Sequence, residues 1–246
     1  SRGYRSGAFN GRVNDVRLAG PVDPERVDQF EVGLKSDWMD NRLRVNLTAF
    51  YSDVSNLQVQ SDVRVEDVLR QTLQNAGAAT IKGLELEVIA RPHPDLLLEF
   101  NGGLMDAGFD RLEKFDANGD EVFDETDIEL GKQLDFSRVP EANFDISATY
   151  TLPRFIEAMP GNFDYRVSYT WKDGFPTSLD NSETLFQQSH GILDMSLTYE
   201  EQNWRVSFYG KNLTRKKVTQ VKSQIFNFQS FGGEERRYGL VLRVNY

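Results

Sequence analysis

The acidic segment from Asp116 to Asp127 carries the residues whose types and spacing most clearly suggest chemistry. Counting Asp116 as position 1 of a calcium-binding loop places oxygen ligands at positions 1, 3, 5, 7, 9 and 12. These ligands are the side chains of Asp116, Asn118, Asp120, Asp124 and Asp127 and the carbonyl of Val122. Calcium takes roughly six to eight oxygen ligands and offsets the repulsion between crowded carboxylates. The spacing therefore predicts a structural Ca²⁺ that orders this loop and has no catalytic role.

Two positions of this loop depart from the calcium-binding pattern. Glu121 stands where a glycine usually makes the sharp turn, and a left-handed backbone there would cost about 1 kcal/mol. Asp127 replaces the usual bidentate glutamate and has a shorter reach. The alternative interpretation of the segment is an acidic loop that is simply solvated.

Composition excludes several classes of function. The formal net charge of -10 argues against a nucleic-acid partner, because phosphate binding needs a basic surface. The absence of cysteine excludes disulfides, thiolate metal sites and cysteine nucleophiles. We find no nucleophile elbow, phosphate loop or pair of catalytic carboxylates, so the sequence does not predict an enzyme. No run of about 18 apolar residues predicts a membrane-spanning helix.

The elements that must position the loop are strands, because apolar and polar residues alternate along most of the chain. Residues 43–51 give the clearest case, and the terminal segment 238–246 repeats it with a tyrosine at each end. We count about ten such strands. They are joined by short turns at 40–41, 92–95, 153–162 and 202–203, and by long connections at 52–78, 106–140 and after 213. Short turns at one end and long loops at the other are typical of outer-membrane barrels.

Several apolar rows end in aromatic residues, while the opposite rows carry Arg, Glu, Asp, Asn, Ser and Thr. In a soluble sandwich such polar rows would need nearly complete pairing in a dry core, whereas a water-filled lumen hydrates them. An open sheet in lipid would leave two unpaired edges. The sequence therefore predicts an all-β, antiparallel transmembrane β-barrel whose sheet either closes on itself or continues into strands that this chain lacks.

Several segments resemble the C-terminal half of the barrel of TonB-dependent outer-membrane receptors, and they occur in that family's order. They are Arg2–Asn10, Pro24–Lys35, Asn41–Tyr51, Asn75-Ala-Gly77, Gly83–Glu87, Lys211-Asn-Leu213 and the terminal aromatic strand. The resemblance covers essentially all of residues 1–246. It implies roughly the last ten strands of a 22-stranded barrel, with the plug domain, the N-terminal strands and the N-terminal box that TonB grips all absent from this chain.

The resemblance also implies a function and partners. Family members mostly import ferric siderophores, with cobalamin, other metal complexes, haem or oligosaccharides as minority substrates. The expected partners are TonB, the plug domain, the remaining barrel strands, outer-membrane lipid and lipopolysaccharide. The basic run from Arg215 to Lys217 is a candidate contact for an anionic ligand or for lipopolysaccharide phosphates.

Charged residues on the polar rows are candidates for substrate contact inside the barrel. They are Glu85, Glu87, Glu99, Arg166, Arg205 and Arg243. The alternative for these residues is a set of ion pairs that stabilise the barrel wall and face a plug. Two other fold interpretations also remain at this point: a soluble, calcium-dependent β-sandwich that binds glycans, and a complete ten-stranded porin-like barrel.

Overall fold

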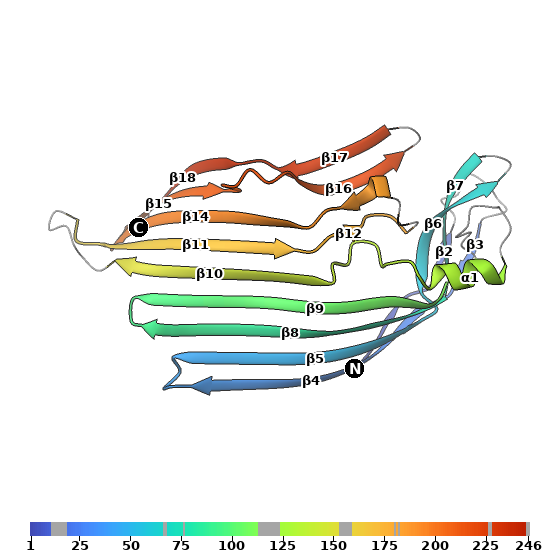
Figure 1. Ribbon diagram of the computed structural model, residues 1–246, viewed down its shortest axis with the longest axis horizontal. Helices are drawn as coiled ribbons and strands as arrows, with labels where there is room; N and C mark the ends of the chain where they lie inside the picture. Colours follow the sequence, from blue (N-terminus) through green and yellow to red (C-terminus); the bar gives the residue numbers. More distant parts are fainter. Residues whose placement is uncertain are drawn as a thin grey trace.

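Ten antiparallel strands form one curved sheet, in the order β1-β4-β5-β8-β9-β10-β11-β14-β15-β18 (Figure 1). The computed structural model describes residues 1–10, 19–65, 68–75, 77–112, 124–152, 159–179, 181, 183–225 and 228–244. The sheet strands are β1 (Arg2–Arg5), β4 (Glu25–Trp38), β5 (Leu43–Ser55), β8 (Gly77–His93), β9 (Leu96–Leu112), β10 (Ala142–Leu152), β11 (Asn162–Lys172), β14 (His190–Glu201), β15 (Trp204–Lys211) and β18 (Arg237–Val244). The predicted antiparallel sheet of about ten strands is confirmed.

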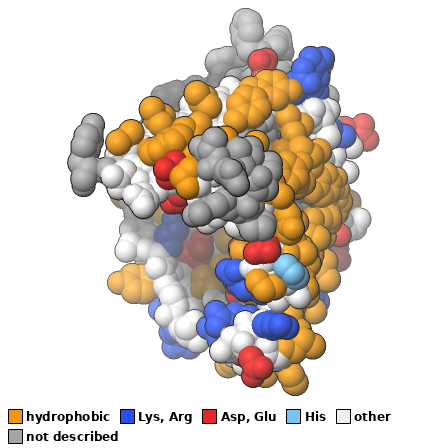
Figure 2. Space-filling view, turned by 90° about the vertical axis from the view of Figure 1, so that its left-hand side faces the viewer, with side chains coloured by type: hydrophobic (Ala, Val, Ile, Leu, Met, Phe, Trp, Pro, Cys, Tyr) orange, Lys and Arg blue, Asp and Glu red, His pale blue; other side chains and the backbone are white. Residues whose placement is uncertain are grey.

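The predicted apolar rows form one exposed band across the sheet. In register, Leu34 of β4 lies opposite Leu47 of β5, and Leu47 lies opposite Leu86 of β8. The band continues to β18, where Leu242 lies opposite Val206 of β15. Hydrophobic side chains gather over the right-hand and upper side of the curved sheet, whereas the hollow on the other side contains acidic and basic side chains (Figure 2). Large apolar side chains exposed in this way need a lipid environment.

The two ends of the sheet differ in their connections (Figure 1). At one end the strands are joined by short turns, and Asp40 and Asn41 adopt the left-handed backbone that their turn requires. At the other end of the sheet, several strands are longer than predicted. The long connections there contain further short elements. These are β2 (Ala8–Asn10), β3 (Gly20–Val22), β6 (Gln58–Val65), β7 (Val68–Asn75), α1 (Glu125–Gly131), β12 (Phe175–Pro176), η2 (Glu183–Leu185), β13 (Phe186–Gln187), β16 (Val218–Ile225) and β17 (Phe228–Glu234).

The buried apolar core lies at the end with the long connections. Its centre is formed by Val54, Ala79, Phe109 and Leu112, from β5, β8 and β9. Partly buried side chains from the long connections pack against this centre, and the ring of Phe136 stacks on Phe109 at a centroid distance of 4.2 Å. The connection from β9 to β10 is therefore held against the sheet by apolar burial.

Aromatic rings lie over glycines of neighbouring strands at several places. A Cβ atom on Gly83 would come within 2.7 Å of the Phe50 ring, and one on Gly239 would come within 2.4 Å of the Tyr209 ring. Each of these glycines lies directly opposite its aromatic partner in the strand register. Such pairs pack a large ring into the space that a glycine leaves open, and they help to fix the register.

The observed sheet contradicts both alternative interpretations of the fold. A sandwich needs two packed sheets with their apolar faces inward, but the ten main strands form one sheet whose apolar face is exposed. A complete ten-stranded barrel needs pairing between β1 and β18, but these strands lie at opposite edges of the sheet. Among the described residues, no helix has both the length and the apolar character needed to cross a membrane.

Candidate functional site

The polar face of the sheet brings two of the predicted site residues together. Arg166 of β11 donates to Glu99 of β9 at 2.6 Å and to the hydroxyl of Thr149 at 3.0 Å. Ser147 of β10 donates to the same Glu99 oxygen at 3.1 Å. Since both charged side chains are only partly exposed, this is a hydrogen-bonded ion pair that ties β9 to β11 across β10. This geometry supports a role in stabilising the wall.

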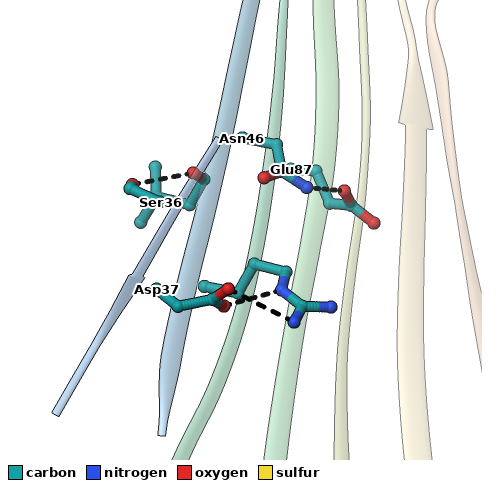
Figure 3. Close-up of polar contacts among 6 residues, drawn as sticks. Ser36, Asp37, Asn46 and Glu87 are labelled. Atoms are coloured by element: carbon teal, nitrogen blue, oxygen red, sulfur yellow. Dashed lines mark hydrogen bonds and ion pairs between the residues drawn. The ribbon is translucent and has the colours of Figure 1, made fainter. Parts of the chain in front are cut away.

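A second polar group lies on β4, β5 and β8 (Figure 3). The amide of Asn46 donates to Glu87 at 2.5 Å, and Arg44 donates to the carboxylate of Asp37 at 2.8 and 3.5 Å. Ser36 belongs to the apolar row, and its hydroxyl donates to the backbone carbonyl of Val45 at 3.0 Å. That bond satisfies a polar group that would otherwise face lipid.

The remaining candidates for substrate contact do not converge on one site. Glu85 is exposed on β8, opposite Thr48 and Gly103 in the register. Arg205 lies at the end with the short turns and forms an ion pair with Glu200. Arg243 lies opposite Arg205 on β18 and is exposed. The six candidates are therefore distributed along the polar face and do not form one binding site.

A cavity of about 740 Å³ opens at the end with the long connections. Its walls come from β9, from the connection between β9 and β10, and from the connection between β11 and β14. Four carboxylates lie along it, and two phenylalanines add aromatic surface; these residues are Asp106, Asp135, Glu141, Asp173, Phe136 and Phe186. Lys82 is 2.9 Å from Asp106 and balances one of the four charges. The cavity can therefore hold a partly apolar ligand in an acidic environment.

The predicted calcium loop is only partly within the described residues. Asp116, Asn118, Asp120 and Val122 lie outside them. Asp124 and Asp127 form a capping box at the start of α1: Asp124 accepts from the Thr126 N–H at 2.7 Å, and Asp127 accepts from the Asp124 N–H at 2.9 Å. Among the described residues, no group of three or more histidine, aspartate or glutamate side chains is arranged to hold a metal ion. Calcium binding therefore stays a prediction.

The calcium prediction is tested by isothermal titration of chelator-treated protein. We expect heat of binding with a Kd of about 10⁻⁴ M, as in extracellular calcium modules. The Asp120→Ala variant should lose that heat, because it removes one of the predicted ligands and keeps the capping-box residues Asp124 and Asp127. A titration without any heat that a chelator removes would contradict the prediction.

The sequence pattern missed the residues that hold the long connections. Asn75, Gln58 and Asn181 make side-chain hydrogen bonds to the backbone of segments far away in the sequence. Their contacts depend on how the connections fold over each other, and strand periodicity carries no such information. Asn75 and Gly77 stood out only through the family resemblance.

The first comparison with known proteins is at the level of sequence. Residues 1–213 match the family described as TonB dependent receptor-like, beta-barrel. The chain belongs to this family. The family resemblance seen in the sequence is thereby confirmed, and so is the antiparallel barrel-type sheet that it implies. The TonB-dependent receptor family is one of transporters and receptors.

Solved structures give the same fold at low sequence identity. The ferric yersiniabactin uptake receptor FyuA from Yersinia pestis matches with a TM-score of 0.79 and 20% identity, over 100% of this chain and 34% of its own length. The siderophore receptor PiuA from Acinetobacter baumannii matches with a TM-score of 0.66 and 18% identity, over 90% of this chain and 28% of its own length. The ferric preacinetobactin receptor BauA from the same organism matches at 0.64 and 16%, over 98% and 32%. This TonB-dependent receptor chain thus spans about a third of the length of these structures.

Proposed function

We propose that this chain forms part of the wall of an outer-membrane receptor that takes up a ferric siderophore complex with energy supplied by TonB. The observation that carries the proposal is the continuous apolar band on one face of a sheet whose other face is polar. Such a sheet fits a barrel wall between lipid and a hydrated lumen. The family match and the siderophore receptors among the similar structures support the choice of ligand.

The proposal assigns a role to each end of the sheet. Long loops are extracellular in barrels of this kind, so the acidic cavity at that end faces the medium and contacts the arriving ligand. The apolar band contacts membrane lipid, and the exposed basic residues from Arg215 to Lys217 contact lipopolysaccharide phosphates. The plug, the TonB contact and the strands that pair with β1 and β18 come from outside this chain.

The test is uptake of ⁵⁵Fe by cells that express the complete receptor. We expect saturable uptake of one class among hydroxamate, catecholate and carboxylate siderophores. This uptake should disappear in a strain without TonB and in a strain without the receptor gene. Uptake of every tested siderophore that is independent of both genes would refute the proposal.

A matched pair of substitutions tests the cavity. Asp135→Asn removes a cavity carboxylate without changing its shape, and Asp40→Asn makes the same change in a turn at the opposite end. Removing one negative charge should raise the affinity for an anionic ferric complex about twofold to threefold, and should lower it for a cationic complex. Equal affinities for the two variants would show that the ligand does not contact the cavity.

A further inference from the structure

Three asparagines in the long connections hold the backbone of another residue by the same two-point contact. In each case the side-chain carbonyl accepts from a backbone N–H, and the side-chain amide donates to the backbone carbonyl of that same residue. The pairs are Asn75 with Asp23 (2.7 and 2.9 Å), Asn181 with Asp135 (2.7 and 3.0 Å) and Asn212 with Lys216 (2.8 and 2.8 Å). A carboxamide presents a donor and an acceptor side by side, so it pairs with a residue as a neighbouring strand would.

Asn75 joins the first two long connections of the chain. It lies at the end of β7, whereas Asp23 lies 52 residues earlier, between β3 and β4. The Asn75 amide also donates to the carbonyl of Asn56 at 2.9 Å, and this bond joins the segment before β6 to the last residue of β7. Gln58 reinforces the contact, because its buried side-chain amide donates to the carbonyls of Asp23 at 3.0 Å and Ser6 at 3.1 Å.

Asn181 joins the connection between β9 and β10 to the connection between β11 and β14. Asp135 follows α1, and Asn181 lies between β12 and β13. A backbone bond from the Arg138 N–H to the Pro176 carbonyl, 2.8 Å long, crosses between the same two connections. Leu179 packs against the apolar core, and its carbonyl accepts from the Asn181 amide at 3.1 Å. Asn212 differs, since it binds a residue only four positions away within its own connection.

We propose that Asn75 and Asn181 are positioning residues that couple neighbouring extracellular connections into two units. One unit contains the β1–β4 and β5–β8 connections, and the other contains the β9–β10 and β11–β14 connections. The acidic cavity lies between the two connections of the second unit. The link to a ligand rests on the proposed function, but the coupling itself does not.

Amide hydrogen exchange of the complete receptor in detergent, without ligand, tests the coupling. Asn75→Ala should raise exchange in residues 19–25 about tenfold, because the segment loses two hydrogen bonds that hold it. Asn181→Ala should raise exchange in residues 133–138 by a similar factor. Asn75→Asp keeps the shape but puts a carboxylate oxygen against the carbonyls of Asp23 and Asn56, which repel it, so it should raise exchange at least as much as Asn75→Ala. Exchange in β8 and β9 should stay unchanged in all three variants.

Asn212→Ala is the matched control. It removes the same two-point contact but should raise exchange only within residues 212–216, leaving both coupled units unchanged. The proposal is wrong if Asn75→Ala and Asn181→Ala change exchange in the partner segments by less than twofold. It is also wrong if strands β8 and β9 lose protection to the same extent, since the asparagines would then stabilise the sheet as a whole.

A second experiment repeats the hydrogen-exchange measurement in the presence of the siderophore identified by the uptake assay. In the wild-type receptor, ligand should protect both connections of the second unit together. In Asn181→Ala the ligand still touches both walls of the cavity, so both connections should gain protection, but less than in the wild type, and the rates of ligand association and dissociation should both rise. Equal protection of both connections in wild type and variant would overturn the coupling. Failure of every siderophore to bind would refute the proposed function alone, because exchange without ligand decides the coupling independently.

Discussion

Replacing Leu47 with arginine is expected to destabilise the receptor in a lipid bilayer by about 2–4 kcal/mol. Leu47 lies midway along the exposed row of β5 and is 42% exposed. On the neighbouring strands it is flanked by Leu34 and Leu86, so a guanidinium there has only apolar neighbours in register. The cost arises because a charge at the middle of the bilayer loses its hydration.

Thr48→Arg is the matched control for this prediction. Thr48 is the next residue of the same strand, and it lies on the polar face opposite Glu85. An arginine at this position stays hydrated and gains an acidic neighbour, so its effect should stay below about 1 kcal/mol. Urea unfolding of the receptor in phospholipid vesicles measures both values. Equal destabilisation by the two substitutions would contradict the assignment of the lipid-facing side.

Alanine at Gly77 is expected to cost about 3 kcal/mol or to prevent β8 from pairing correctly. The backbone of Gly77 has a φ of +138°, which side-chain-bearing residues rarely adopt. A Cβ atom there would also lie 1.8 Å from the carbonyl oxygen of Arg111 on β9. Both effects act where β8 begins, next to a register shift in its pairing with β9.

Gly108→Ala is the control for the Gly77 prediction. Gly108 belongs to β9, and a Cβ atom on it would meet nothing within 4 Å. Its effect should stay within about 0.5 kcal/mol. Urea unfolding gives the change in stability, and hydrogen exchange of β8 and β9 shows where pairing is lost. A Gly77→Ala receptor as stable as the Gly108→Ala receptor would disprove the close approach at Arg111.

Most of the sheet could be predicted from the sequence, because a strand in a barrel wall has two different solvents on its two faces. The alternation in β5 and β18 therefore predicts which side chains face lipid, and the apolar rows of neighbouring strands lie opposite each other in the register. The turn at Asp40 and Asn41 was also predictable, since those residue types favour its left-handed backbone.

The long connections were predictable only in their length. Strands β6 and β7 were missed because the polar residues that dominate this connection indicated a loop. The start of α1 was not predicted, because the spacing of Asp124 and Asp127 fits a calcium loop as well as a capping box. Contacts such as that of Arg166 with Glu99, 67 residues apart, depend on strand register, which alternation does not fix.

The aromatic rings that pack over glycines help to determine the strand register, which the alternation of apolar and polar faces leaves undetermined. Shifting one strand past its neighbour by two residues keeps every apolar side chain on the lipid side, so hydrophobicity alone cannot distinguish the shifted sheet from the correct one. A two-residue shift between β5 and β8 would move Phe50 from Gly83 to Glu85 or Ile81, and one between β15 and β18 would move Tyr209 from Gly239 to Val241 or Arg237. Each shifted ring would meet a side chain where it now has open space. These glycines therefore disfavour a two-residue shift in strand register, which the separation of apolar and polar faces alone does not prevent.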